Sequence, residues 1–108
     1  MIVLPVRGRD AAAHLSRALL RSASAAGLAV AIDSLRMHPW ASATFTGNRL
    51  SVTLVMPRAP ALGRWLADLP LADLPLPGHL VASLAVDAIE DDGATVRAAL
   101  TVLVVDRE

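Results

Sequence analysis

Three histidines are the first side chains of this sequence to weigh for chemistry. His14 has no acidic residue and no second histidine three or four positions further along, so it lacks the spacing with which one helix holds a zinc ion. His38 stands in a His-Pro-Trp turn, and His79 opens an expected strand. A three-histidine site would need the fold to bring distant segments together, and we expect no metal ion.

Asp33 and Asp87 stand at similar places in two apolar stretches, "LAVAID" and "LAVDAI". Paired carboxylates can act as acid and base when their surroundings separate their pKa values. The simpler interpretation is that each points to solvent from a sheet, because no nucleophile or group of oxyanion donors accompanies them. The sequence has no cysteine, no phosphate-binding glycine loop and no nucleophile-elbow serine, and it therefore indicates no catalytic residue and no cofactor.

Two helices are expected to position these residues. The first covers residues 10–26, with Asp10 as its N-cap and Gly27 as its stop. The second begins after Pro57 and Pro60, since proline suits a first helical turn. Its apolar stripe consists of Leu62, Trp65, Leu66 and Leu69.

Strands are expected between and after the helices. Residues 28–37 form one, in which the apolar parity shifts and indicates a bulge near Asp33 and Ser34. "HPW" ends it, and a hairpin follows with Gly47-Asn48 as its turn. The returning strand carries Leu50, Val52, Leu54 and Met56 on one face. A last pair, 80–90 and 94–106, is joined by the turn "EDDGA".

The expected order is α-β-β used twice, in a single domain with repeat-like halves 10–57 and 58–106. Two amphipathic helices can cover one face of a four-stranded antiparallel sheet. The sequence therefore predicts an α+β fold, a two-layer sandwich of the ferredoxin-like kind in a permuted α-β-β-α-β-β order. A short extra edge strand from residues 2–6 is an alternative that the sequence leaves open.

The stretch "APALGRWLADL", the closing strand "VRAALTVLVVDRE" and the run into "AAGL" resemble the soluble domain of the M-type protein of type II secretion systems and its relative in type IV pilus assembly. The resemblance covers most of the chain in order and implies the permuted ferredoxin-like fold and a place in a membrane-associated assembly. The chain departs from the family in lacking its membrane anchor and cytoplasmic tail, and in its proline-rich connection after the second helix.

Charge is balanced overall but uneven along the chain. Formal net charge is zero and all ten basic residues are arginine, which gives no general attraction to nucleic acid. Eight arginines and two acids precede Trp65, while two arginines and eight acids occur from Trp65 onward. This asymmetry fits two halves held together, two chains paired head to tail, or merely different solvated faces.

The location of the protein follows from where the chain starts. No apolar run is long enough to span a membrane. A natural start at Met1 indicates a cytoplasmic protein, whereas an excised secretion-type domain would be periplasmic or associated with the inner membrane.

The second face of the sheet is the expected contact surface. If the helices cover Leu80, Leu84 and Val86, the other face is almost without charge and mildly apolar, as contact surfaces often are. We expect a homodimer that buries roughly 600 Å² per chain there, against roughly 800 Å² in a standard interface. The expected interface residues are Val55, Val81, Ser83, Ala85, Thr101, Leu103 and Val105.

The repeated stretch "LADLPLADLPLPG" has two interpretations. It is either the exit from the second helix, with Leu71, Leu74 and Leu76 capping the core, or a proline-rich ligand for a partner. The close spacing of its leucines favours the first.

Two functional hypotheses remain. The first is a non-catalytic protein–protein interaction or assembly module, in the manner of a secretion or pilus platform scaffold. The second is a small dimeric α+β enzyme or ligand-binding domain with a cleft between helices and sheet, which a deep polar pocket with converging ionisable groups would favour.

Overall fold

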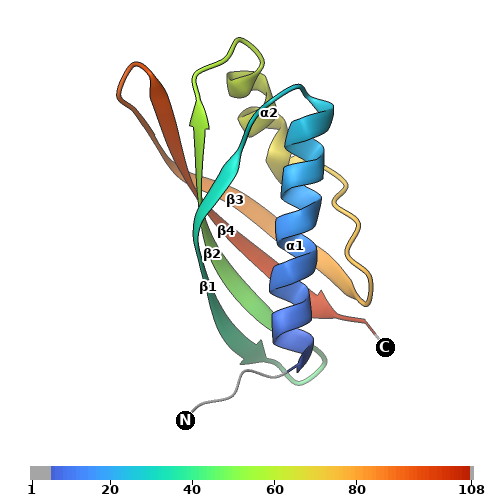
Figure 1. The fold of residues 1–108 in the computed structure, drawn as a ribbon. Coiled ribbons are helices and arrows are strands. Elements are labelled where there is room, and N and C mark those ends of the chain that lie inside the picture. The colour runs from blue at the N-terminus through green and yellow to red at the C-terminus, as the bar shows by residue number, and fades with distance from the viewer. Residues whose placement is uncertain (1–5, 108) are drawn as a thin grey trace.

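The computed structural model describes the backbone of residues 6–107 and the side chains of residues 10–107. The element order is α1 (Val6–Ala25), β1 (Ala31–Ala41), β2 (Thr46–Pro57), α2 (Leu62–Asp68), the 3₁₀ turn η1 (Leu69–Leu71), β3 (His79–Asp91) and β4 (Thr95–Asp106). Both helices lie on the same side of one four-stranded antiparallel sheet (Figure 1). The expected α+β architecture, with two helices and an antiparallel sheet, is confirmed.

The sheet interleaves the two halves of the chain. Its strand order is β1-β2-β4-β3, and every neighbouring pair is antiparallel. The centre therefore consists of one strand from each half, while β1 and β3 are the edges. Neither half can bury its own sheet face without the other, which makes one shared core.

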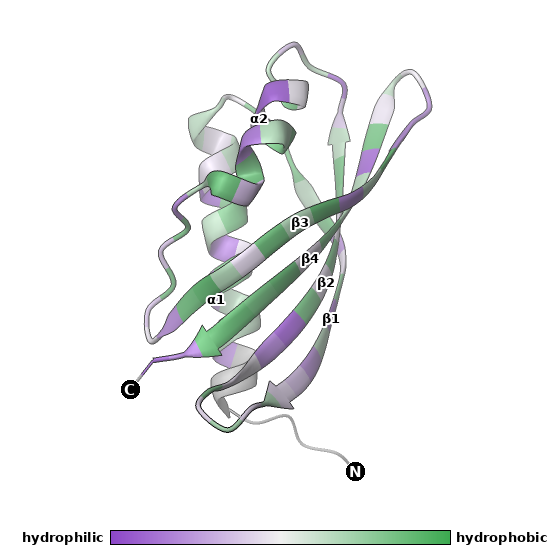
Figure 2. Cartoon of the chain, turned by 180° about the vertical axis from the view of Figure 1, so that it is seen from behind, coloured by the Kyte–Doolittle hydropathy of each residue, from purple (hydrophilic) through white to green (hydrophobic). Residues whose placement is uncertain are grey.

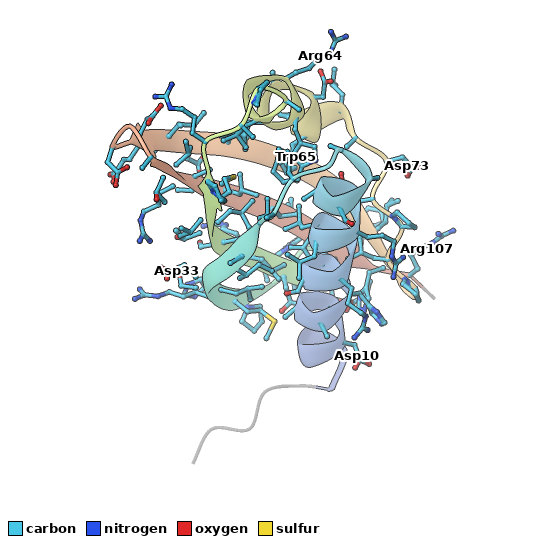
Figure 3. All side chains as sticks on the ribbon, turned by 45° about the horizontal axis from the view of Figure 1, so that its top comes forward. Asp10, Asp33, Arg64, Trp65, Asp73 and Arg107 are labelled. Atoms are coloured by element: carbon cyan, nitrogen blue, oxygen red, sulfur yellow. The ribbon has the colours of Figure 1, made fainter. Side chains whose placement is uncertain are left out.

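The core lies between the helices and the inner sides of the two central strands. Leu50, Leu54, Leu100 and Val102 are almost fully buried. The expected stripe of α2 is confirmed, because Leu62, Trp65, Leu66 and Leu69 are all buried. Trp65 lies between α2 and α1 (Figure 3), and its indole Nε1 donates a hydrogen bond to Ser22 Oγ at 3.0 Å.

The first helix starts earlier than expected and ends where expected. Asp10 lies within α1, which begins at Val6, so the expectation that Asp10 is the N-cap is wrong. Gly27 has φ of +76°, and the N–H of Leu28 donates to the carbonyl of Ala23 at 2.9 Å, which closes the helix end. Of the extra edge strand considered for residues 2–6, residues 2–5 lie outside the described part, and Val6 is the first residue of α1.

The first hairpin turns earlier than expected. β1 continues through Pro39 to Ala41, and the turn is formed by Ser42 to Phe45, where Ser42 N donates to the Phe45 carbonyl at 2.7 Å. Phe45 N in turn donates to Ser42 Oγ at 3.1 Å. Pro39 has no backbone N–H to donate, but it does not end β1. An edge strand has backbone positions whose N–H needs no partner, and a proline is tolerated there. The expected Gly47-Asn48 turn is therefore wrong, and both residues lie inside β2.

Bulges interrupt both edge strands. The register of β1 shifts between Ile32 and Ser34, which confirms the bulge expected there. The register of β3 shifts between Val81 and Ser83 and again between Val86 and Ala88. Each bulge moves the side chains beyond it to the other face.

The repeated stretch leaves α2 through η1, which contains Pro70. Leu69 keeps a helical conformation, with φ −53° and ψ −43°, although it precedes a proline. Leu74 and Leu76 are buried as expected, but Leu71 is 91% exposed, so the expectation that Leu71 caps the core is wrong. Across residues 6–107 no helix is long and apolar enough to cross a membrane.

Candidate functional site

The side of the sheet turned away from the helices, here called the open face, carries no second layer within the described residues (Figure 2). Strand pairing arranges its side chains in rows, because residues opposite one another share a face. Its members are Ala31, Ser34, Arg36, His38 and Trp40 on β1; Gly47, Arg49, Ser51, Thr53 and Val55 on β2; Arg97, Ala99, Thr101, Leu103 and Val105 on β4; and Leu80, Ser83, Ala85, Ala88 and Glu90 on β3.

One of the expected interface residues lies on the opposite side of the sheet. Val81 pairs with the fully buried Val104 and packs against the core, so its expected place on the open face is wrong. The bulge at Ala82 is the reason, since it reverses the parity of the strand. Leu80, expected under the helices, lies on the open face and is 52% exposed. The register places the other expected interface residues on this face.

One end of the open face is apolar. Trp40 pairs with Gly47, Gly47 with Val105, and Val105 with Leu80, so these four residues form a single row across all four strands, here called the apolar row. The indole N–H of Trp40 is covered and has no hydrogen-bond partner among the described residues.

The rest of the open face is charged, contrary to the expectation of a nearly uncharged surface. Asp33 accepts a hydrogen bond from Arg97 at 2.7 Å, and both side chains are about half exposed. Arg36 and Arg49 lie on the β1 and β2 side, here called the basic half. Hydrophilic residues along these strands and apolar ones along β3 and β4 are visible in Figure 2.

Asp87 and Glu90 give the β3 and β4 side, here called the acidic half, its charge. Asp87 is the residue at the second bulge of β3 and accepts a hydrogen bond from the hydroxyl of Thr101. Asp33 and Asp87 belong to opposite edge strands, about 14 Å apart by strand spacing. The structure does not bring the two carboxylates together, so they cannot share a proton as an acid–base pair.

Two of the three histidines approach one another at the other side of the sheet. The rings of His14 and His79 are 6.0 Å apart, whereas His38 is on the open face. His79 is buried, and its Nδ1 lies 3.1 Å from Asp106 Oδ1. Thr46 Oγ1 donates to the second oxygen of the same carboxylate at 3.1 Å.

This arrangement positions an imidazole without completing a metal site. The part of the chain that the structure describes contains no group of three or more side chains suited to hold a metal ion. His14 is instead bonded to Arg17, whose Nη2 donates to its Nδ1 at 3.0 Å. No sequence signal could have linked His79 to Asp106, since the strand pairing alone sets them opposite each other.

A pocket of about 570 Å³ lies at the same end of the sheet as the apolar row. It is lined by residues 42–46 together with Leu80, Val105, Asp106 and Arg107. Phe45 and Leu80 are each more than half exposed at its edge. The pocket is therefore half apolar surface and half polar loop, and Asp106 connects it to His79.

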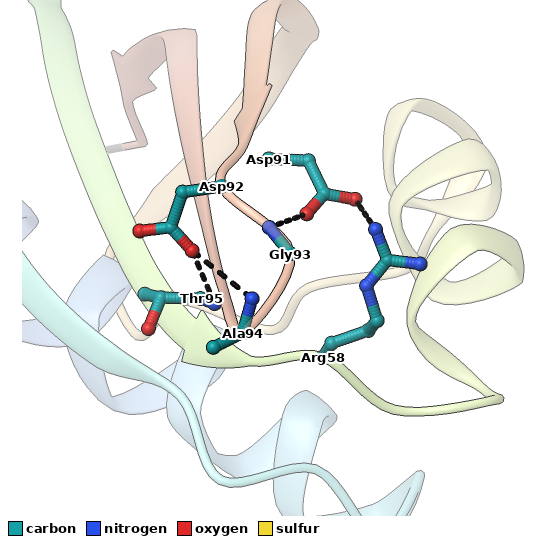
Figure 4. Close-up of polar contacts among 6 residues, drawn as sticks. All are labelled: Arg58, Asp91, Asp92, Gly93, Ala94 and Thr95. Carbon is teal, nitrogen blue, oxygen red and sulfur yellow. Dashed lines mark hydrogen bonds and ion pairs between the residues drawn. The ribbon is translucent and has the colours of Figure 1, made fainter.

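The turn between β3 and β4 holds the acids whose pKa values are most clearly displaced. Backbone N–H groups of Thr95 and Ala94 donate to Asp92 and hold the pKa of its carboxyl below the usual value (Figure 4). The pKa of Asp91 is lowered by hydrogen bonding to Arg58 and then to Gly93 N–H. These contacts fasten a tight turn and leave no reactive group free.

No protein-family model, curated protein or solved structure matches this chain significantly.

Proposed function

We propose that this chain is a non-catalytic protein–protein interaction module that associates through the open face of its sheet. The observation that carries the proposal is the apolar row, in which Leu80 is 52% exposed and Trp40 is partly exposed, whereas Val105 between them is 9% exposed. Apolar side chains that remain exposed on an uncovered sheet face are stabilised by contact with a partner surface. Isolated exposed apolar residues elsewhere need no such explanation.

The two edge strands are poorly suited to pair with a strand of another chain, which favours association through the open face. β1 contains Pro39 and the bulge at Asp33, and β3 contains two bulges. Both features protect an edge against pairing with another chain. Association through the open face avoids these obstacles, because it needs side-chain contacts rather than a regular backbone ladder.

For the fold we propose the ferredoxin-like arrangement in its permuted form. Moving the first strand of a β-α-β-β-α-β unit to its end gives α-β-β-α-β-β, the element order of this chain. The strand order β1-β2-β4-β3 supports the same assignment, with the last strand at the centre beside β2. On this basis a scaffold role like that of the M-type secretion and pilus-assembly domains, with membrane-assembly proteins as partners, is the specific form of the proposal.

A matched pair of substitutions tests the use of the face. Leu80 and Ile89 both lie on β3, with 52% and 54% of their surfaces exposed, but Ile89 pairs with Ala98 on the helix side. We expect the native chain to associate in sedimentation velocity at micromolar concentration, Leu80→Asp to be monomeric, and Ile89→Asp to behave as the native chain. A native chain that is monomeric at high micromolar concentration would contradict the proposal.

The pocket at the sheet end supports a second candidate, a small-ligand-binding domain. Asp106 lies in its wall, while its carboxylate is held by buried His79 and by Thr46. The pocket lies beside the sheet end rather than between helices and sheet, where the cleft was expected. Chemical-shift changes confined to residues 42–46 and 105–107 in a small-fragment screen would favour this candidate.

A further inference from the structure

We propose that the open face is covered by a second copy of this chain, related by a two-fold axis that lies parallel to the strands between β2 and β4. The inference rests on the proposed function and specifies its partner and orientation. Such an axis lays β1 of one copy over β3 of the other. Each row of one copy then faces the same row of the other copy, with its four residues in the opposite order. Each side chain of the face then has a defined counterpart.

The apolar row is self-complementary about this axis. Reversal places Trp40 opposite the partner's Leu80, and Gly47 opposite the partner's Val105. The indole and the leucine are the two large side chains at the ends of the row, and each meets the other. Gly47 and Val105 in the middle of the row are buried within the chain, so the contact at this end rests on the two end residues.

Charge decides between the two in-plane axes. Asp33 and Arg97 neutralise each other within the chain, so the basic half retains Arg36 and Arg49 and the acidic half retains Asp87 and Glu90. An axis parallel to the strands lays the basic half over the acidic half. An axis across the strands would lay β1 over β1 and the basic half over itself, which like-charge repulsion disfavours.

One pair of charges falls in a shared row. Arg36 belongs to the row that continues through Ser51 and Thr101 to Ala85, and the bulge residue Asp87 reaches this row through the hydrogen bond that its carboxylate accepts from Thr101. Reversal therefore sets Arg36 of each copy over Ala85 of the other, beside the carboxylate of Asp87, twice per dimer. Both residues are exposed in the single chain.

The size of the face suits a reversible dimer. Four strands and five rows project an area of about 600 Å² from the usual strand spacing and rise. A standard specific interface uses about 800 Å² per partner. The open face is therefore somewhat smaller than a standard specific interface, in the size range of weak and transient contacts.

Complementary charge reversal tests the orientation. We expect Arg36→Asp and Asp87→Arg each to weaken self-association at least about tenfold, because each homodimer then contains two like-charge contacts. An equimolar mixture of the two variants should recover the native affinity within about threefold, since both contacts of the mixed dimer are again of opposite sign. Sedimentation equilibrium measures all three association constants.

The control is Arg64→Asp, which makes the same charge change at an 89% exposed position on α2 and should leave association unchanged. If Leu80→Asp abolishes association but neither reversal affects it, the face is used in another orientation and this inference fails while the proposed function stands. If the native chain is monomeric, the proposed function fails as well.

Circular dichroism establishes that both reversals fold. Should Asp87→Arg unfold the edge strand, Asp87→Asn and Arg36→Gln replace the pair. Each is then expected to weaken association about threefold, with no recovery on mixing, because neither supplies a new charge. Unchanged association in both neutral variants overturns the inference.

Discussion

Gly47 is the residue of β2 at which the fold leaves no room for a side chain. A Cβ added there would lie 2.0 Å from the backbone oxygen of Val104, far inside contact distance. We expect Gly47→Ala to lower the free energy of unfolding by at least about 2 kcal/mol, because two central strands must move apart. Gly63→Ala is the matched control. Its added Cβ meets nothing within 4 Å in α2, so it should stabilise the protein by about 0.5–1 kcal/mol. Urea unfolding of both variants measures the contrast.

Asp92 makes the stability of the β3–β4 turn depend on pH. Its folded-state pKa is lowered by the N–H groups of Thr95 and Ala94, so the stability it contributes is present above its ordinary value of 3.8 and is lost as pH falls through the folded pKa. We expect the stability difference between the native chain and Asp92→Ala to shrink as pH is lowered from 5 to about 2.5. Asp92→Asn cannot titrate either, so the native–Asn difference should shrink by the same amount, whereas the difference between the Asn and Ala variants should be the same at every pH. A native–Ala difference that grows on acidification would contradict the assignment.

At the scale of elements, the two copies of "LADLP" have different structures. Leu66 opens the first copy and is buried in α2, whereas Leu71 opens the second and is 91% exposed. We expect Leu74→Ala to lower the free energy of unfolding by about 2–4 kcal/mol and Leu71→Ala to change it by less than about 0.5 kcal/mol. Denaturant titration measures both. Loss of association in Leu71→Ala, with stability unchanged, would instead show that a partner reads this stretch.

The edge strands mark how far the sequence could predict the elements. In β1 the apolar residues themselves change parity, from Ile32 to Leu35, and so the bulge at Asp33 was predictable. In β3 the extra residue is Ala82. Alanine occurs on both buried and exposed faces of strands, so the sequence does not indicate a bulge there. The assignment of Leu80 and Val81 to faces was therefore wrong, although the strand itself was found.

The open face and the His79–Asp106 contact also differ in how far the sequence could predict them. Val105 and Leu103 were predictable members of the open face because β4 alternates without interruption. The apolar row was not, since it depends on Leu80 and on Trp40, which was expected in a turn outside β1. The His79–Asp106 contact joins residues 27 positions apart and depends on the register of the last hairpin. Local patterns gave strands and helices, whereas the register across strands decides which side chains meet.

At the scale of the whole molecule, the uneven charge along the sequence is only partly neutralised within the chain. Arg97 with Asp33 and Arg58 with Asp91 each join a residue that precedes Trp65 to one that follows it. Arg36, Arg49, Asp87 and Glu90 remain on the open face without an ion-pair partner among the described residues. The asymmetry thus becomes a surface with two oppositely charged halves, suited to meet a reversed copy of itself.

This layout predicts a defined response of the dimer to salt. Screening shortens the reach of exposed charges from about 14 Å near 0.05 M to about 4 Å near 0.5 M ionic strength. We expect the dissociation constant, measured by sedimentation equilibrium, to rise severalfold over that range without complete dissociation, because contacts of the apolar row are not screened. A chain carrying both Arg36→Asp and Asp87→Arg restores opposite charges at each contact, so it should dimerise like the native chain with the same salt dependence. Arg36→Asp alone should show the reverse, with association that strengthens as salt screens its like charges. A native dissociation constant that is unchanged by salt would leave only the apolar row as the source of association and would remove the charge argument for the orientation.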